Sequence, residues 1–422
     1  MSVRAFLEIV RLELLAIWRS GTLALLAAVS SVWVLAFPWL VKGDGTAEGA
    51  RELYVRYSLG GVFVLVLLSL LAAATGTLAK ERQAKRLQLT LVRPVRYFSV
   101  ALGKMVALTA CGALVLALAA SLLGVRIGLS AQCDHVLSPV LPSPQEEAKL
   151  MYEEYMKDPD TPEAVRKAKR STVLRLLTQR AIDHYQTIAT NDQASWSFRL
   201  ADSAPSNQLK VRMRFTNQFE MRQDLVGLFR LGGLTGPVSN ITQAVLTVPL
   251  TGAEGVTTPV AELSFENQGR QTLMLRPRRD INLLIPADGF GANLLRTFLV
   301  LTALLALVIA FGTFLSAALG RPVALFVALV TLIVGEMSPS VIEQYPDSLE
   351  TDRLDRIGLV LTRFAAEVTH PLSALSPLES LSRDECVEKR DVLRAIALDA
   401  LAVPLLLALL SALVMPRKQD DV

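Results

Sequence analysis

The amino-acid sequence predicts a membrane α-helical protein. We expect six transmembrane helices, an N-terminal interfacial helix and an external α+β, β-sandwich-like domain between the third and fourth spans. Six apolar runs are each long enough to cross the roughly 30 Å hydrocarbon core of a bilayer. Residues 126–290 instead have the patterns of a water-soluble domain. Hydrophobic residues make up 52% of the chain and charged residues 19%, and the mean hydropathy is +0.41, which fits such a mixed protein.

Residues 1–21 predict a cytoplasmic amphipathic helix that lies in the membrane interface. Arg4, Glu8 and Arg11 recur along one side of this helix, apolar side chains cover the other, and Trp18 falls near headgroup level. The alternative is an ordinary first helix packed on its own domain. Because an apolar span follows directly, we expect the interfacial arrangement.

The spans divide the rest of the chain into segments. The first three lie in residues 22–125, and residues 80–104 form a basic hinge between the second and third. The fourth and fifth lie in residues 291–342. An external loop with short amphipathic helices, residues 343–392, precedes the segment 393–422, which holds the sixth span and a basic tail. The six apolar runs are 22–41, 57–79, 105–125, 297–319, 323–342 and 395–415.

The external domain is expected to begin with two helices and to continue with at least five strands. Ser143-Pro144-Gln145-Glu146 is a capping box with proline at the first helical position, and Thr161-Pro162-Glu163 opens a second helix that reaches about Ile188. Apolar residues then alternate with polar ones, as in strands. For Trp196 we expect a core position, with a sugar-binding platform as the alternative. The alternating residues are Trp196, Phe198 and Leu200; Leu209, Val211, Met213 and Phe215; Ala244, Leu246 and Val248; Ala261, Leu263 and Phe265; and Ile281, Leu283 and Ile285.

The orientation follows from the positive charges of the short loops, which are retained in the cytoplasm. The hinge is rich in Lys and Arg, and Glu81 is its only acid. With the hinge, the link at 320–322 and the tail at 416–418 inside, both termini are cytoplasmic. The opposite orientation would place the basic hinge outside. The basic residues of the hinge are Lys80, Arg82, Lys85, Arg86, Arg93, Arg96 and Lys104.

The sequence contains no catalytic signature. Gly103-Lys104 lacks the upstream glycine and the following Ser or Thr of a P-loop, and HExxH and GxSxG motifs are absent. The three histidines, His135, His184 and His370, are too scattered to propose as metal ligands. We therefore expect no enzymatic activity, no bound cofactor or metal, and no nucleic-acid partner. Any ATP hydrolysis belongs to another chain.

Four further residues are candidates for special roles. Glu336 and Asp399 fall at membrane depth, where a carboxylate costs about 2.5–3.5 kcal/mol. They either pair with Arg394 or Arg296 at the interface or form the polar lining of an outward exit. Cys133 and Cys386 are both predicted outside, so a disulfide between the domain and the 343–392 loop is possible.

The hinge resembles the signature region of the type-2 permeases of ATP-binding-cassette (ABC) transporters. The matching residues are Glu81 at the end of a charged helix, the proline-containing turn 89–96, and Leu-Gly-Lys at 102–104. In place of the family's glycine after the acid, this chain has residues 83–85. The interfacial helix, the six spans and the amphipathic segment before the last span resemble most closely the copper-enzyme-maturation and gliding-type branch. The 126–290 domain is not part of the family's common core.

The resemblance implies a bacterial inner-membrane permease that dimerises with itself or a paralogue. ATP and Mg would bind to the partner, two copies of a cytoplasmic ATPase subunit, and a periplasmic partner is possible. Basic hinge residues would steer the encounter with the ATPase, and leucines would anchor it. The alternative is that the basic residues set topology and contact anionic lipids. The expected docking residues are Glu81, Arg82, Lys85, Arg86, Leu89, Arg93 and Arg96.

Three functions are consistent with these patterns. The first is a permease subunit of an ATP-driven exporter. The second is a mechanotransmission or envelope-assembly subunit that relays ATPase motion to the external domain without moving a substrate. The third is a membrane-anchored sensor whose external domain binds a ligand. Copurification of an ATPase separates the first two from the third.

Overall fold

The computed structural model describes residues 3–40, 47–83, 97–128, 132–158, 170–182, 184–200, 209–217, 223–243, 245–252, 259–343 and 376–417. The chain divides into two compact units. The helical unit comprises Met1–Ala131, Gly289–Pro339 and Thr362–Val422, and the β-rich unit comprises Gln132–Asp288 and Ser340–Leu361. Each unit has its own hydrophobic core.

The described part of the helical unit contains five helical stretches that are long and apolar enough to cross a membrane. These stretches are Thr22–Leu40, Gly49–Ala79, Tyr97–Ile127, Phe290–Ala318 and Lys389–Val414, and they coincide with predicted spans one to four and six. The protein is thus a membrane helical protein with an additional β domain. The predicted fifth span falls on α10, whose described apolar stretch is Arg321–Ile333, so the count of six remains a prediction. The helical elements are α1 (Val3–Arg19), α2 (Thr22–Leu40), α3 (Ala47–Gln83), α5 (Tyr97–Ile127), α9 (Phe290–Ala318), α10 (Arg321–Glu343), α12 (Ser376–Ser382), α13 (Lys389–Arg394), η1 (Ala395–Ala402) and α14 (Val403–Arg417).

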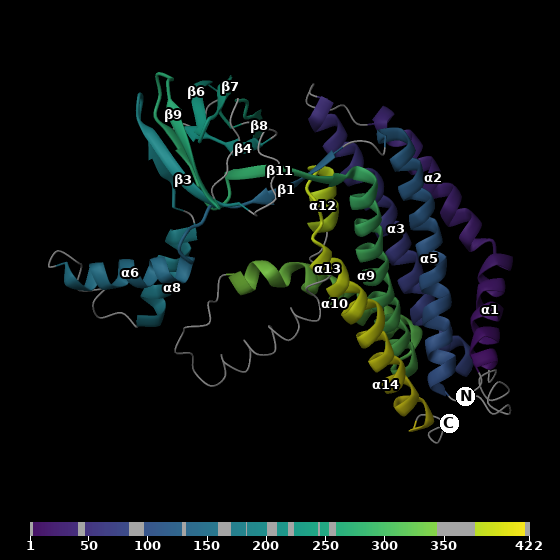
Figure 1. The fold of residues 1–422 in the computed structure, drawn as a ribbon. Coiled ribbons are helices and arrows are strands. Elements are labelled where there is room, and N and C mark those ends of the chain that lie inside the picture. Colours follow the sequence, from purple (N-terminus) through teal and green to yellow (C-terminus); the bar gives the residue numbers. More distant parts are fainter. Residues whose placement is uncertain are drawn as a thin grey trace. The chain divides into compact units, whose positions relative to one another are not determined.

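Helix α9 is the central helix of this unit and packs against α3, α5 and α14 (Figure 1). Small residues allow the close approach, as is usual between membrane helices. At Gly312 a Cβ atom would lie 2.9 Å from Cδ1 of Leu71 and 3.2 Å from Cβ of Ala74 on α3. The buried Ser316 accepts a hydrogen bond of 3.0 Å from the backbone N–H of Ala79. The second half of α3 is therefore held tightly on α9.

Helix α1 packs lengthwise on α5. Its Ile9 lies at Gly103 of α5, and the groove between the two helices continues from Leu14 to Cys111. The predicted apolar face is thereby split between two environments. Phe6, Val10, Leu14 and Ile17 are half-buried, whereas Leu7, Leu12, Leu15 and Trp18 remain exposed. The helix is amphipathic as predicted, but it follows the bundle, which the expectation of a separate interfacial helix did not anticipate.

The last apolar stretch contains a π-helical segment, η1, directly before α14. Pro404 is the second residue of α14. Proline has no N–H to donate and its ring collides with the carbonyl four residues earlier, so a regular α-helical turn is disfavoured there. The wider π turn directly before Pro404 is an irregularity of the kind that proline causes in helices.

The described residues of the β-rich unit form two four-stranded sheets and one three-stranded sheet. The orders are β1-β11-β4-β8, β3-β9-β6-β7 and β2-β10-β5. A single core unites the sheets, and the ring of Phe265 lies tilted against those of Phe215 and Phe229 at centroid distances of 4.7 and 4.6 Å. The elements are β1 (Gln132–Leu137), α6 (Pro144–Lys157), α8 (Arg170–Ile182), β2 (Gln186–Ile188), β3 (Gln193–Arg199), β4 (Lys210–Arg214), β5 (Thr216–Asn217), β6 (Asp224–Leu231), β7 (Leu234–Ile241), β8 (Val245–Pro249), β9 (Val260–Asn267), β10 (Leu273–Leu275) and β11 (Ile281–Gly289).

The predicted strand phases are confirmed, because the alternating residues that the structure describes are buried; Ala244 lies outside the described residues. Trp196 is a core residue with 4% of its surface exposed, and its indole N–H donates to Oε1 of Gln186 at 2.9 Å. The prediction of a second helix reaching Ile188 was wrong at its end. Residues Gln186–Ile188 form β2, in which Ile188 pairs with Leu273 of β10.

The capping box at the start of α6 is confirmed. The hydroxyl of Ser143 accepts a hydrogen bond from the backbone N–H of Glu146, and the Glu146 carboxylate accepts one from the N–H of Ser143 at 2.9 Å. The second bond lowers the pKa of Glu146 below its usual range. Arg278 then holds α6 in place, because its guanidinium lies 2.7 Å from the carboxylate of Glu147.

Candidate functional site: the Lys104 ion-pair cluster

A buried ion-pair cluster joins three helices of the helical unit. Lys104 of α5 is 4% exposed. Its ammonium lies 2.8 Å from Oε1 of Glu81 on α3 and 2.9 Å from Oε2 of Glu13 on α1. We call these three residues the Lys104 cluster. Both carboxylates retain partial exposure, so the cation is the deeply buried member and two acids compensate its charge.

The positions of Glu81 and Lys104 along their helices explain how the cluster forms. Glu81 occupies the last turn of α3, and Lys104 lies two turns into α5, so the pair ties together the two ends of the hinge. The neighbouring Gly103 lets α1 come close, since a Cβ there would lie 2.7 Å from Cγ2 of Ile9. The Leu-Gly-Lys motif at 102–104 therefore has a structural role. Gly103 leaves space for α1, and Lys104 forms an ion pair with Glu13 of α1.

Glu13 is the member that the sequence analysis missed. Phe6 lies seven residues before Glu13, and Ile17 lies four residues after it. Residues at this spacing share one side of a helix, so Glu13 lies on the packed face of α1. An acid in the middle of an apolar helix face needs a buried cationic partner. That position is the signal from which the pair with Lys104 could have been found.

The predicted docking residues fall mostly outside the described part of the chain. Glu81 is described and belongs to the Lys104 cluster. Arg82 lies in α3, but its side chain is outside the described residues. The remaining docking residues, all outside the described residues, are Lys85, Arg86, Leu89, Arg93 and Arg96. Their role stays a prediction.

The other end of α3 carries a second polar cluster. Arg51 lies 2.9 Å from Oδ1 of Asp384, and Arg383 lies 3.4 Å from Oε1 of Glu52. The Arg51 guanidinium also stands over the ring of Phe290, at 5.1 Å from its centroid. We call Arg51, Glu52, Arg383 and Asp384 the Arg51 cluster. It fastens the turn after α12 to the start of α3.

The two clusters are separated by most of the length of α3. From Glu52 to Glu81 a helix rises about 44 Å, at about 1.5 Å per residue. A bilayer with its headgroup regions is about 40–45 Å thick, and only the core of about 30 Å is free of water. If α3 crosses a bilayer, each cluster falls at one membrane surface. Arg51, Glu52 and Glu81 of this long helix are then paired where water and headgroups begin.

Of the two acids predicted at membrane depth, the structure describes the side chain of Asp399 but not that of Glu336. Asp399 is buried within η1, with 8% of its surface exposed. Among the described residues, no hydrogen bond or ion pair to its carboxylate is present, and the charge that acts on it is Arg394. The alternative partner, Arg296, instead contacts the carbonyl of Val387 at 3.5 Å. Glu336 lies in α10, and its side chain is outside the described residues.

The disulfide that the sequence leaves possible between Cys133 and Cys386 stays a prediction. Cys133 and Cys386 are both thiols, the first in the β-rich unit and the second in the helical unit. The buried Cys133 thiol donates to the carbonyl oxygen of Asp288 at 3.0 Å. Cys111 is a buried packing residue of α5, as expected.

No group of histidine, cysteine and acidic side chains in the described part of the chain could hold a metal ion.

Comparisons of the chain with protein-family models, with curated proteins and with solved structures find no match.

Proposed function

We propose that this chain is the permease subunit of an ATP-driven ABC exporter in a bacterial inner membrane, with both termini in the cytoplasm. The hinge 80–104 docks on a separate ATPase, and the Lys104 cluster passes its movement to α1, α3 and α5. The chain itself binds no nucleotide in this scheme, and it acts as a dimer.

The observation that carries the proposal is the burial of Lys104 between Glu13 and Glu81. A basic loop that only sets topology needs no ion pair between its two ends. Here the two ends of the hinge are joined at 2.8 Å, and a third helix is added at 2.9 Å. Because breaking such a buried pair costs about 3–5 kcal/mol, a displacement of the hinge moves the three helices together more easily than it separates them.

Copurification of the ATPase is the decisive test of docking. The chain, purified in mild detergent from its native membrane, is expected to bring down an ATP-binding subunit. The double variant Arg82→Glu/Arg86→Glu is expected to lose that subunit, whereas Arg82→Lys/Arg86→Lys, which keeps both charges, retains it. Absence of any ATP-binding subunit from the wild-type preparation would overturn the proposal.

The second candidate function is mechanotransmission without transport. One observation favours it: β11 ends at Gly289 and α9 begins at Phe290, so no linker residue separates the β-rich unit from the central helix. A movement of α9 would then act on β11 through a single peptide bond.

An inserted linker separates the two functions. A flexible linker of four residues, Gly-Ser-Gly-Ser, inserted between Gly289 and Phe290 should abolish the cellular function of a mechanotransmitter while leaving ATPase binding intact. An exporter that moves its substrate through the helical unit should keep its transport activity with the same insertion. Insertion of the same linker after Gly252, in the β-rich unit, controls for damage to that unit alone.

A further inference from the structure

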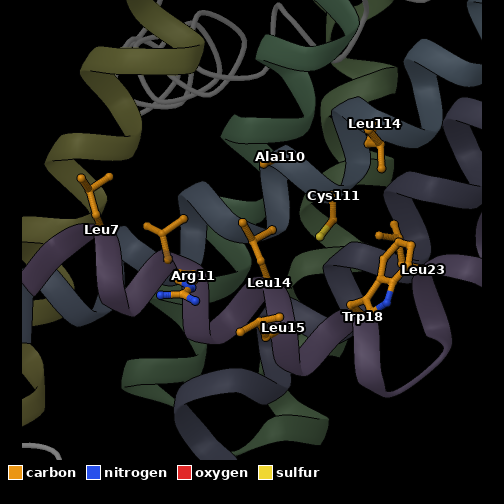
Figure 2. Close-up of a pocket in the computed structure, with 10 residues that line it drawn as sticks. Leu7, Arg11, Leu14, Leu15, Trp18, Leu23, Ala110, Cys111 and Leu114 are labelled. Atoms are coloured by element: carbon orange, nitrogen blue, oxygen red, sulfur yellow. The ribbon is translucent and has the colours of Figure 1, made fainter. Parts of the chain in front are cut away.

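A groove of about 610 Å³ lies between α1 and α5 (Figure 2). Its walls are apolar side chains, among them Leu15 and Trp18 of α1 and Ala110 and Leu114 of α5. Trp18 is 65% exposed and Leu114 is 59% exposed. In water, so much exposed apolar surface along one groove would be unfavourable. Because α5 is one of the helices long and apolar enough to cross a membrane, acyl chains are the apolar molecules available to cover it.

Among the described residues, one charged side chain lines the groove, and it is a cation. Arg11 belongs to a stripe on α1 in which Arg4, Leu7, Arg11, Leu15 and Trp18 follow each other at intervals of three or four residues. Residues at this spacing share one face of a helix. Guanidinium and apolar groups therefore alternate along the same exposed face.

Arg11 is available to an anion. Its ion pair with Glu8 is long, at 3.7 Å, and both side chains are largely exposed, at 71% and 62%. An exposed pair of this kind contributes little free energy, so a stronger acceptor can replace the carboxylate. A phosphate accepts two parallel hydrogen bonds from one guanidinium, which makes it such an acceptor.

We propose that this groove binds one anionic phospholipid, with its phosphate on Arg11 and one acyl chain along Leu15, Trp18 and Leu114. The charge of Arg11 selects an anionic headgroup, and the apolar walls hold the chain. This lipid site is independent of the ATPase proposed above. It would attach α1 to the bilayer on the face that the Lys104 cluster leaves exposed.

Native mass spectrometry of the delipidated full chain tests the site with two lipids of equal chain length, phosphatidylglycerol and phosphatidylcholine. The wild type is expected to hold one phosphatidylglycerol more tightly than phosphatidylcholine. Arg11→Gln should weaken phosphatidylglycerol binding about tenfold, the effect of losing one charge-assisted interaction. It should weaken phosphatidylcholine binding much less, because the choline cation already offsets the attraction between the guanidinium and the phosphate. Arg19→Gln, at an exposed cation of α1 that does not line the groove, is the matched control and should bind like the wild type.

The acyl-chain half of the site needs its own variant. Ala110→Phe fills the groove and should weaken both lipids equally; Leu114→Trp serves the same purpose if the first variant unfolds at a lower temperature than the wild type. An equal loss in Arg11→Gln and Arg19→Gln would overturn the proposal in favour of general charge attraction. The same spectra report the oligomeric state. If the groove variants dissociate a dimer and keep the lipid, a second copy of the chain covers the groove and the proposal fails.

Discussion

Lys104 of α5 and Glu13 of α1 form an ion pair of 2.9 Å between residues 91 positions apart in the sequence. The pair lies beside Gly103, where a Cβ atom would lie 2.7 Å from Cγ2 of Ile9 on α1. Helix α1 is therefore part of the helical unit, fixed at its centre by charge and close packing. The same ammonium binds Glu81 at the start of the hinge, so the position of α1 and that of the hinge are coupled through one side chain.

Removing the cation of the Lys104 cluster should destabilise the protein. Lys104→Met leaves the carboxylates of Glu13 and Glu81 without their cation. We expect the free energy of unfolding to fall by about 3 kcal/mol. This is the lower end of the range for a broken buried pair, because both carboxylates keep some contact with water. Thermal unfolding in detergent, followed by tryptophan fluorescence, measures the loss.

The matched control removes all three charges. Lys104→Met combined with Glu13→Gln and Glu81→Gln should recover most of the stability, since no unpaired charge remains. If the proposed function is correct, Lys104→Met alone still binds the ATPase, but the hydrolysis rate of the ATPase no longer changes when this variant is present. A Lys104→Met protein as stable as the wild type would show that the ion pairs contribute nothing.

The contact at Gly103 should be equally sensitive to size. In Gly103→Val the new Cβ would lie 2.7 Å from Cγ2 of Ile9, so α1 has to move away, at a cost of about 1–3 kcal/mol. Ile9→Ala alone removes packing, but in combination with Gly103→Val it should restore part of the stability. A double-mutant cycle on thermal unfolding measures this coupling, and strictly additive effects would refute the close approach.

Asp399 should limit the stability of the last apolar stretch. The Asp399 carboxylate is buried and has no hydrogen bond among the described residues. An acid at membrane depth costs about 2.5–3.5 kcal/mol, so Asp399→Leu is expected to raise the free energy of unfolding by about 2 kcal/mol. Asp399→Asn should give a smaller increase. A decrease in either variant would reveal a partner that holds the carboxylate. A stabilised Asp399→Leu protein without transport activity would support the polar-exit role.

The start of α6 should respond to pH. Ser143→Ala removes one half of the capping box and should cost about 1 kcal/mol in local stability at neutral pH, seen as faster hydrogen exchange of the first α6 amides. The folded pKa of Glu146 is lowered, so its contribution is complete above its usual value of 4.5 and is lost as the pH falls through the lowered pKa. The exchange difference between wild type and Glu146→Ala should therefore vanish under strongly acidic conditions. A difference that persists there would contradict the capping role of the carboxylate.

The local patterns of the sequence predict much of this fold. Apolar runs locate the long helices, and the Ser143 capping box locates α6. Strict alternation places Trp196, Val211 and Phe265 in the core, because side chains alternate between the two faces of a strand. Each of these features depends on neighbours within a few positions of the chain, which is why the sequence alone reveals them.

Other features depend on partners far away in the chain and could not be predicted. The end of the second helix was set too late because pairing of β2 with β10 takes Ile188 into a sheet. The order of strands in each sheet joins distant segments, which alternation does not specify. The β6–β7 hairpin was missed, although Gly232-Gly233 between two apolar strands is a recognised hairpin signal. In the candidate site, Glu81 and Lys104 were noticed as parts of a motif, but their ion pair and its extension to Glu13 needed the packing of three helices.

The fixed length of α3 makes the geometry of this protein depend on the thickness of its host membrane. The helix is too long and too well packed on α9 to shorten, so in a bilayer of short-chain lipids it has to tilt. A tilt keeps the Lys104 cluster and the Arg51 cluster at the two surfaces of a thinner bilayer but changes how the helical unit packs in it, whereas a bilayer of long-chain lipids draws one of the clusters toward the hydrocarbon. The protein is therefore expected to be most stable in lipids of one chain length and to lose stability in both shorter and longer ones.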